Sequence, residues 1–305
     1  MTHIKTAIFP VAGLGSRFLP ITKSVPKEML PLIDRPLIQY AVDEAKSAGI
    51  ENLIFVSSHD KPAIKHYFQT NAKLENHLFQ NKKVANLRQV QLATLPELSY
   101  HFVYQNEPRG LGHAVWTARE YINDEPFAVI LPDDFIHAEK SCLTQMIERH
   151  AKTGGNMVAT MEVGAHEISA YGCLDYSEVD GNCLKANGMV EKPNAEDAPS
   201  TQAVVGRYIL QPSVLEKLAT TQPGAGGEIQ LTDAIAADSK TEQLWGLQFQ
   251  GQRYDCGNKI GYLDAITALA LARADTAKGF RQVINRQTQR DQTTRIRAAI
   301  SFGAC

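Results

Sequence analysis

Short apolar runs alternate with helical patterns of hydrophobic positions along the first half of the chain. Residues 6–11 form an apolar run that enters a glycine-containing loop, which is typical of a buried parallel strand. From residue 36, apolar residues recur at helical spacing until Gly49, where the helix is expected to end. Strands that alternate with helices indicate an α/β fold with a mainly parallel sheet. The same pattern predicts further strands at residues 52–58, 100–105 and 127–131, and helices at residues 61–94 and from about residue 111.

The pattern changes after Gly154. Shorter strand-like runs follow, and Asp180-Gly181 between two of them predicts a hairpin. Helices return near residues 228–237 and 258–274. We therefore predict one domain over residues 1–275 and a C-terminal tail over residues 276–305. The domain is expected to consist of a first half at about residues 1–153, an inserted β-rich lobe at about residues 154–257 and a returning helix at residues 258–274.

The charge of the chain argues against a nucleic acid partner, and its apolar runs are too short for a membrane helix. The sequence carries 31 lysines and arginines against 33 aspartates and glutamates, a net charge of −2, whereas nucleic acid binding needs a clustered cationic surface. Residues 281–297 are locally basic and are interpreted as a solvated terminal helix or frayed tail, with a binding arm as the alternative. No stretch approaches the ~20 apolar residues of a membrane helix, and the apolar run near the N-terminus is too short for a secretion signal.

Cysteine and histidine spacing predicts neither a disulfide framework nor a histidine metal centre. The five cysteines are odd in number and contain no C-x-x-C pair. Reduced thiols in a cytosol, and hence a cytoplasmic protein, fit that pattern better. The nine histidines lack metal-ligand spacing and are interpreted as surface or incidental residues.

The loop after the first predicted strand contains Gly13 and Gly15, followed by Arg17. It matches neither common phosphate motif, because Phe18 stands where a dinucleotide fingerprint needs a third glycine and no G-K-[ST] follows. The glycines still let backbone N–H groups approach an anion closely, and the arginine adds a planar charged donor. A triphosphate-binding loop is the functional interpretation, and an ordinary strand-to-helix turn with solvated charges is the alternative.

The full string around this loop carries a family resemblance. Residues 13–20 fit G-x-G-S-R-x-x-P, and residues 26–31 follow with P-K-E-M-L-P. Together they resemble the sugar-1-phosphate nucleotidyltransferases, in the form found in bacterial UTP:glucose-1-phosphate uridylyltransferases. The resemblance covers roughly residues 4–274. It implies a Rossmann-like nucleotidyltransferase fold, in which helices flank a mixed sheet and the β-rich lobe binds the sugar.

The same resemblance implies an activity and an assembly. The implied reaction transfers the uridylyl group of UTP to glucose 1-phosphate and gives UDP-glucose and pyrophosphate. It is expected to proceed by in-line displacement at the α-phosphorus with Mg²⁺ as cofactor. Relatives in this family are commonly dimers or tetramers, so a homodimer or homotetramer is expected.

The phosphates are expected at the N-terminal segment. The resemblance implies that the backbone of Ala12, Gly13 and Gly15 binds the nucleotide. It implies that Arg17 holds the leaving pyrophosphate and that Lys27 bridges the reacting phosphates. The chemistry agrees, because two anions must be brought together while charge spreads over phosphate oxygens, so cationic stabilisation matters more than acid–base catalysis.

Two aspartates are the predicted magnesium ligands. Asp133 follows the strand predicted at residues 127–131, at the carboxyl end where ligands usually bind, although a helix cap or turn is the alternative. The resemblance selects Asp133 and Asp255 as the ligands and gives Asp134 a supporting position. Mg²⁺ prefers hard oxygens and commonly takes one or two carboxylates plus substrate phosphates.

The nucleobase is expected at the end of the strand predicted at residues 100–105. There the resemblance places Gln105 and Gly110. A glutamine amide can accept from uracil N3–H, but the same amide can rotate to match cytosine. Rejection of CTP is therefore expected to need a fixed backbone group, such as that of Ala12.

The sugar phosphate is expected at Gly172, Glu191 and Lys192, again by the resemblance. Neighbours on a strand face opposite sides, so Glu191 and Lys192 can serve one ligand only if the strand ends or twists between them. Residues 224–233, a glycine-rich stretch before a helix predicted from about Glu228, also resemble the uridylyltransferases.

Two alternative functions remain open. The same chemistry with dTTP differs by one methyl group, whose rejection is worth only ~1–3 kcal/mol. The other alternative is a non-catalytic relative that binds a nucleotide sugar or an active sister subunit. Such a regulator has no need of both predicted metal carboxylates, Asp133 and Asp255.

Overall fold

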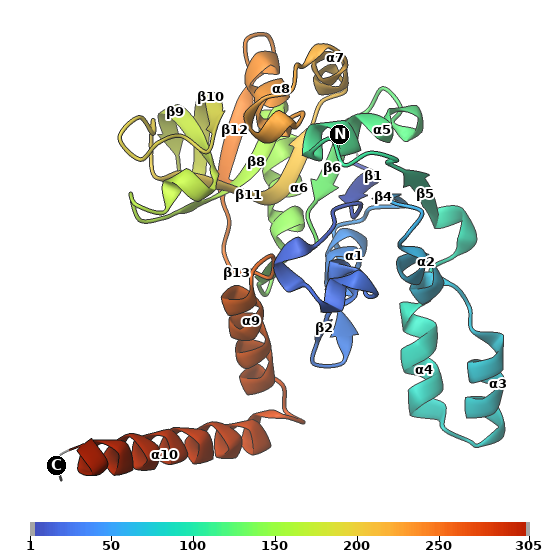
Figure 1. Cartoon of the computed structure of the whole chain (residues 1–305). Coiled ribbons are helices and arrows are strands. Elements are labelled where there is room, and N and C mark those ends of the chain that lie inside the picture. Colours follow the sequence, from blue (N-terminus) through green and yellow to red (C-terminus); the bar gives the residue numbers. More distant parts are fainter. Residues whose placement is uncertain (1–3, 303–305) are drawn as a thin grey trace.

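A nine-stranded sheet with the strand order β5-β4-β1-β6-β11-β8-β12-β10-β9 organises the chain (Figure 1). The structure is a computed structural model that describes residues 4–302, without the side chains of residue 225 and residues 291–302. The first four strands in the sheet order are parallel, as the alternation of apolar runs and helices predicts. They are β1 (Thr6–Pro10), β4 (Asn52–Ser57), β5 (Tyr100–Tyr104) and β6 (Phe127–Ile130).

The second half of the sheet is mostly antiparallel. A hairpin joins β9 to β10 through Asp180 and Gly181, whose φ of 62° suits glycine in the tight turn. Only β12 and β8 pair in parallel here. The prediction of a mainly parallel sheet therefore holds for the first half alone. In the second half a hairpin makes β9 and β10 antiparallel, and β11 runs antiparallel to β6, β8 and β9, which do not adjoin it in the sequence. The strands are β8 (Asn156–Glu162), β9 (Gly172–Asp180), β10 (Cys183–Glu191), β11 (Gln202–Leu210) and β12 (Leu244–Gln248).

The predicted β-rich lobe continues the first sheet. Strand β11 pairs directly with β6 of the first half. Strand β9 pairs with β11 as well as with β10. Two small ribbons lie outside this sheet, and one of them joins a strand that precedes the lobe to a strand at the end of the lobe. The ribbons are β7 (Asp134–His137) with β13 (Gln252–Asp255), and β2 (Pro31–Leu32) with β3 (Arg35–Pro36).

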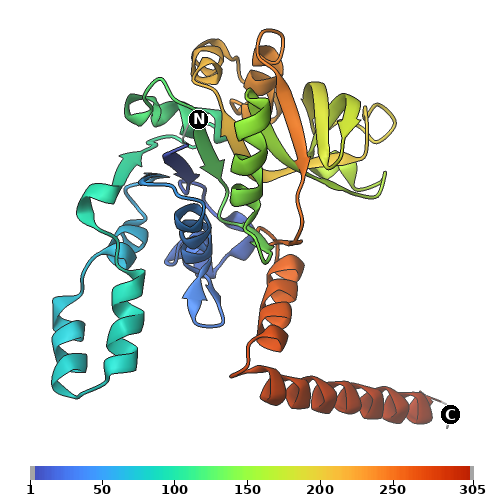
Figure 2. The same cartoon turned by 180° about the vertical axis from the view of Figure 1, so that it is seen from behind.

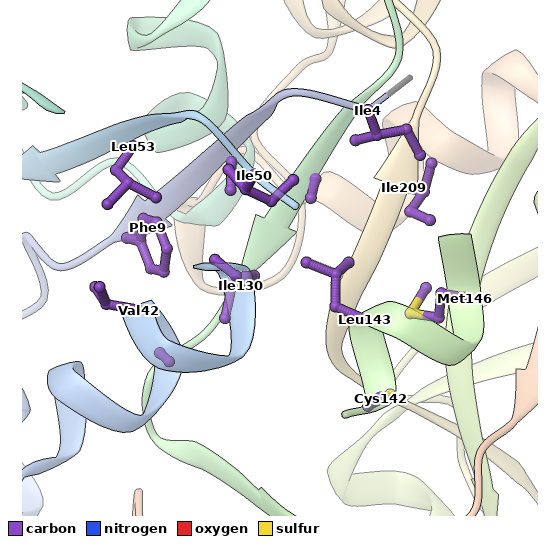
Figure 3. Close-up of a cluster of buried hydrophobic side chains, with 14 of the residues drawn as sticks. Ile4, Phe9, Val42, Ile50, Leu53, Ile130, Cys142, Leu143, Met146 and Ile209 are labelled. Atoms are coloured by element: carbon purple, nitrogen blue, oxygen red, sulfur yellow. The ribbon is translucent and has the colours of Figure 1, made fainter. Parts of the chain in front are cut away.

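Helices cover both faces of the sheet. Side chains of β1 alternate between two hydrophobic layers, with Phe9 on one side and Ile8 on the other. Figure 3 shows Phe9 beside Val42, Leu53 and Ile130. Phe9 is fully buried, and truncation of such a core phenylalanine costs about 3–5 kcal/mol. The first layer is formed with α1 (Leu37–Ser47), α2 (Pro62–Phe68) and α6 (Cys142–Thr153), and the second with α5 (Leu111–Thr117), α7 (Ser213–Thr220) and α8 (Leu231–Asp238).

Two helical segments extend from this body. The region predicted as helical over residues 61–94 contains α2 and then the pair α3 (Ala72–Gln80) and α4 (Val84–Ala93), which projects as a hairpin (Figures 1 and 2). At the other end, α9 (Lys259–Ala272) matches the predicted returning helix. The following α10 (Ala277–Phe302) runs away from the body (Figure 2). Its described side chains are mostly exposed, which agrees with a solvated terminal helix.

Several local predictions are settled by the fold. The helix predicted from about Glu228 begins later, at Leu231, because Gly227 has a φ of 74° and Gln230 is extended. The four cysteines in the described part are buried and unpaired, whereas Cys305 lies outside the described residues. No helix within residues 4–302 has the length and apolar character needed to cross a membrane. Short 3-10 helices lie at Ser16–Phe18, Ile21–Lys23, Lys27–Met29, Glu97–Ser99, Arg119–Tyr121, Ile168–Ala170 and Ala225–Gly227.

Candidate active site

The glycine-containing loop lies directly against the segment that carries Lys27. Gly15 has a φ of 65° and precedes the 3-10 helix Ser16–Phe18, and its carbonyl accepts a 2.9 Å hydrogen bond from the Thr22 hydroxyl. A Cβ atom at Gly15 would lie 3.0 Å from the Cβ of Lys27. Glycine is therefore required both by the backbone conformation and by the close approach. By contrast, a Cβ at Gly13 would meet nothing within 4 Å, so the loop is open on that side.

A buried lysine, Lys61, binds the backbone of this loop. Lys61 is 9% exposed, and its ammonium donates to the carbonyl oxygens of Val11, at 2.7 Å, and Gly13. It also lies 3.0 Å from the carboxylate of Glu28, the neighbour of Lys27. The loop and the Lys27 segment are thereby tied to one cation. Sequence analysis missed Lys61, because a lysine just before a helix has no local signal of burial.

Four predicted residues meet around Gly257. A Cβ atom at this glycine would lie 3.0 Å from Asp133 Oδ2, 2.9 Å from Asp255 Oδ1 and 3.8 Å from Arg17 Nη1. The Lys27 ammonium donates to the same Asp133 Oδ2 at 2.6 Å. The structure thus brings together the two predicted catalytic cations and the two predicted metal ligands, which come from distant parts of the sequence.

The ribbon of β7 and β13 creates this meeting point. Its register pairs Asp255 with Asp134, and the amide of Cys256 donates to the carbonyl oxygen of Asp133 at 2.8 Å. Two neighbours orient the Asp255 carboxylate, since Oδ1 accepts from the Gly257 amide and Oδ2 from the Asn258 side chain, each at 2.9 Å. Asp133 itself follows β6, at the carboxyl end of a parallel strand, as predicted.

Asp134 points away from this centre and holds an arginine. Its Oδ2 accepts from the Gly206 amide at 2.7 Å, and its Oδ1 accepts from Arg253 at 2.6 Å. The same Arg253 donates to the Tyr171 hydroxyl at 3.0 Å. Asp134 therefore anchors Arg253 between the carboxylate centre and the predicted sugar segment. Nothing near Arg253 in the sequence marks it for this position.

Charge coupling keeps Lys27 and Asp133 ionised. Burial raises the pKa of Asp133, but the Lys27 ammonium, with smaller contributions from a backbone hydrogen bond and Arg253, lowers it by more, so the carboxyl pKa ends below its usual range. For Lys27, burial lowers the pKa, and the carboxylates of Asp133 and Glu28 together outweigh that effect, so the ammonium pKa is raised. The centre at neutral pH therefore holds an ammonium and a carboxylate in contact.

The donor set at Gly257 suits a hard cation. Two aspartate carboxylates face one point, and both offer oxygen ligands, which Mg²⁺ prefers. Among the described residues, no group of three or more histidine, cysteine, aspartate or glutamate side chains is arranged to hold a metal ion. A magnesium ion bound by Asp133 and Asp255 would therefore complete its coordination with water or phosphate oxygens.

The predicted base-binding residues meet at the end of β5. The Gln105 amide nitrogen lies 3.3 Å from the Gly110 carbonyl oxygen and 2.8 Å from His113 Nδ1. Gly110 has a φ of 99°, and its Cβ position would lie 2.8 Å from the Ile229 carbonyl oxygen. The middle of the glycine-rich stretch 224–233 thus packs against this corner of the first half of the chain.

Two histidines correct the prediction that histidines are surface or incidental residues. His113 lies within hydrogen-bonding distance of Gln105. His150 is 3% exposed, and its Nε2 lies 3.0 Å from the Gly155 carbonyl oxygen. Both positions depend on contacts across the fold, which metal-ligand spacing does not test.

The predicted sugar-phosphate residues also come together. Gly172 and Glu191 are directly paired on β9 and β10. Strand β10 ends at Glu191, and Lys192 has a φ of 43°, which turns its side chain so that Nζ lies 3.2 Å from Glu191 Oε1. The strand therefore ends as the prediction required. Sequence analysis missed Thr232, whose hydroxyl donates to Glu191 Oε2 at 2.6 Å.

Comparison with known proteins gives a consistent family. Residues 6–271 match the nucleotidyl transferase family. The chain is 47% identical over 257 residues to the UTP–glucose-1-phosphate uridylyltransferase of Komagataeibacter xylinus, covering 84% of this chain and 90% of that protein. It is 42% identical over 272 residues to the enzyme of the same name from Bacillus subtilis (strain 168), covering 89% and 92%.

Solved structures agree with these sequence relatives. A crystal structure of UDP-glucose pyrophosphorylase complexed with UDP-glucose has a TM-score of 0.79 and 43% identity, and the match covers 88% of this chain and 100% of that one. A UTP-bound UGPase from Acinetobacter baumannii has a TM-score of 0.85 and 39% identity, covering 92% and 98%. This chain therefore belongs to the nucleotidyl transferase family and, within it, to the UTP–glucose-1-phosphate uridylyltransferases.

Proposed function

We propose that this protein transfers the uridylyl group of UTP to glucose 1-phosphate and releases pyrophosphate. The observation that carries the proposal is the convergence at Gly257, where Asp133, Asp255 and Arg17 face one point and Lys27 contacts Asp133. Cations and carboxylates so arranged suit a reaction between two phosphate anions. The relatives named above support UTP and UDP-glucose as the nucleotides, since two of the solved structures hold UDP-glucose or UTP.

The proposed chemistry is an in-line displacement at the α-phosphorus of UTP. A phosphate oxygen of glucose 1-phosphate forms the new P–O bond, the bond to the β-phosphate breaks, and pyrophosphate leaves with that electron pair. The attacking phosphate is already an anion, so no general base is required. Lys27 neutralises charge that spreads over the equatorial oxygens, and Arg17 holds the leaving pyrophosphate.

Magnesium fits this arrangement. Asp133 and Asp255 would hold the ion, and when bound it would supply further positive charge beside the reacting phosphates. Lys27 contacts Asp133 at 2.6 Å, so the same lysine also positions one of the two carboxylates. We expect chelation of Mg²⁺ to abolish turnover, and we expect Asp255→Asn to raise the Mg²⁺ concentration needed for half-maximal rate by tenfold or more.

The remaining residues bind the two substrates. The backbone of Ala12, Gly13 and Gly15 is proposed to hold the triphosphate, because Gly13 is open and the loop lies against Lys27. Gln105 and Gly110 are proposed to meet uracil. Gly172, Glu191 and Lys192 are proposed to bind glucose 1-phosphate, with the lysine on the phosphate and the glutamate on sugar hydroxyls.

Pyrophosphate release by the purified protein tests this function. The assay compares UTP, dTTP, CTP, ATP and GTP with glucose 1-phosphate and Mg²⁺, using Lys27→Ala as the inactive variant. Fastest release with UTP, reduced by about 10²-fold or more in Lys27→Ala, is expected from the loss of a preorganised charge. Fastest release with dTTP would keep the mechanism and overturn the substrate. Binding of UDP-glucose without any release would favour the regulatory alternative.

The assembly and the cellular setting also remain proposals. We expect a homodimer or homotetramer, since α9 exposes the apolar side chains of Ile260 and Leu263. Sedimentation of the wild type and of Ile260→Asp tests this contact. Three further points stay predictions. They are the boundary between domain and tail at residue 275, the cytoplasmic location, and the absence of nucleic acid and membrane partners. Removal of residues 277–305 is expected to leave UTP turnover intact.

A further inference from the structure

The Gly110 carbonyl oxygen and the His113 ring hold the side-chain amide of Gln105 in one orientation. The carbonyl oxygen of Gly110, 3.3 Å from Nε2, can only accept a hydrogen bond. Nδ1 of His113 lies 2.8 Å from the same nitrogen. With the His113 proton on Nε2, each of the two amide hydrogens has its own acceptor. The oxygen Oε1 has no hydrogen-bond partner among the described residues and still reaches solvent, so it remains available to a ligand.

Rotation of this amide would be opposed from both sides. A half-turn would place Oε1 against the Gly110 carbonyl oxygen and against the lone pair of His113 Nδ1, and both contacts are repulsive. The second contact requires an unprotonated Nδ1. Burial lowers the pKa of His113, and Arg109 lowers it further against the opposing effect of Glu107, which favours the neutral ring at neutral pH. A neutral ring carries one proton, and only the tautomer with that proton on Nε2 leaves the Nδ1 lone pair to accept from the amide.

The backbone fixes the positions of Gln105 and His113. Gln105 is 6% exposed, and its amide N–H donates to the Ser57 carbonyl oxygen at 2.8 Å, next to the end of β5. His113 lies in the first turn of α5, where the Gly112 N–H donates to the Ile229 carbonyl oxygen at 2.8 Å. The amide and the ring therefore sit on anchored segments, so their contact is set by the fold.

We propose that His113 is a specificity-determining positioning residue. It accepts a hydrogen bond from Gln105 Nε2 and thereby keeps Oε1 directed at the nucleobase, where Oε1 accepts from N3–H of uracil and repels the N3 lone pair of cytosine. This inference rests on the proposed function, and it gives the site a means of rejecting CTP through a side chain.

The test compares UTP with CTP in three variants. His113→Leu removes the acceptor, whereas His113→Asn can keep an acceptor oxygen near the position of Nδ1. The matched control is Thr117→Val on the same helix, because the Thr117 hydroxyl donates to the His113 carbonyl oxygen and does not touch the ring nitrogen. Two readouts are the ratio of kcat/KM for UTP and CTP, and the ratio of their equilibrium affinities without sugar phosphate.

If His113 positions the amide of Gln105, its replacement changes the UTP-to-CTP ratios of kcat/KM and of affinity. If His113 has a merely structural role, these ratios do not change. We expect His113→Leu to narrow the preference for UTP over CTP by about tenfold, which is the loss of one hydrogen bond. We expect His113→Asn to recover most of it and Thr117→Val to leave it unchanged. An unchanged ratio in His113→Leu, or the same narrowing in Thr117→Val, overturns the proposal.

The binding measurement separates this inference from the proposed function. If the wild type binds UTP more tightly than CTP but releases no pyrophosphate, the proposed function fails while the role of His113 can still be tested. If the wild type turns over UTP and His113→Leu keeps the full preference in both readouts, the inference fails alone.

Discussion

The ammonium of Lys61 lies 3.0 Å from the carboxylate of Glu28, and both side chains are buried, at 9% and 3% exposure. The same ammonium donates to the carbonyl oxygens of Val11 and Gly13. Glu28 lies in the 3-10 helix Lys27–Met29. The pair therefore connects this short helix to the loop proposed to hold the triphosphate. A charge so deeply buried is stable only because it is fully partnered.

Replacement of Lys61 by methionine is expected to destabilise the protein by about 3–5 kcal/mol, because it leaves the Glu28 carboxylate buried without its partner. Urea unfolding of the wild type and the variant measures this loss. Lys5→Met provides the control, since Lys5 pairs with Glu51 at 3.9 Å on the surface and should cost less than about 1 kcal/mol. Adding Glu28→Gln to the Lys61→Met variant should recover part of the stability. A Lys61→Met variant as stable as Lys5→Met would contradict this account.

Alanine at Gly257 is expected to impair catalysis far more than stability. Its Cβ would lie 3.0 Å from Asp133 Oδ2 and 2.9 Å from Asp255 Oδ1, so both carboxylates must shift. Small displacements in a preorganised site can cost about 10²-fold in rate. Pyrophosphate release and urea unfolding measure the two effects. Gly279→Ala on α10 is the matched control, because its Cβ would meet nothing within 4 Å. Equal rates in both variants would show that Gly257 is not at the reacting centre.

Loss of the Thr232 hydroxyl is expected to weaken sugar binding selectively. Thr232 donates to Glu191 Oε2 at 2.6 Å, and a hydrogen bond to a charged group is worth about 1.5–3 kcal/mol. Thr232→Val should therefore raise the KM for glucose 1-phosphate by about tenfold or more and leave the KM for UTP unchanged. Thr232→Ser keeps the donor and should behave like the wild type. An equal rise in the KM for both substrates would contradict a selective role of Thr232 in sugar binding.

His150 is expected to make stability depend on pH below neutrality. Burial lowers its pKa in the folded state, against a smaller opposing effect of the Gly155 carbonyl. Between the folded pKa and the unfolded value of about 6.5, the unfolded chain binds more protons, so stability falls as the pH drops through that window. Urea unfolding of the wild type and of His150→Gln across pH 5 to 8 measures the difference. The stability advantage of the wild type should shrink toward low pH, and a constant difference would refute this role.

Much of the proposed site was predictable because its signals are local. The glycine loop, the P-K-E-M-L-P segment and the aspartate after β6 each combine residue type with position in an element, and such patterns can be read along the chain. The fold of the first half was predictable for the same reason, since apolar runs and helical spacing repeat in order. The fold of the second half was less predictable, because a hairpin and long connections place its strands in an order that hydrophobic spacing does not encode.

Most of the residues that were not predicted from the sequence have partners far along the chain. Lys61 lies 33 positions from Glu28, and Arg253 lies 119 positions from Asp134. Thr232 and His113 were part of segments already singled out, but their hydrogen bonds depend on which side chain the fold brings to them. A lysine, a threonine or a histidine carries no local mark of such contacts.

The sequence by itself determined the family, the order of elements in the first half of the chain and the residue types that we propose bind phosphate. Only the tertiary structure decided that Asp133, Asp255, Lys27 and Arg17 share one point, that Asp134 faces Arg253, and which way the amide of Gln105 is turned. The reason is physical, because local sequence fixes backbone preference and chemistry, whereas burial and hydrogen-bond partners exist only once distant segments have packed together.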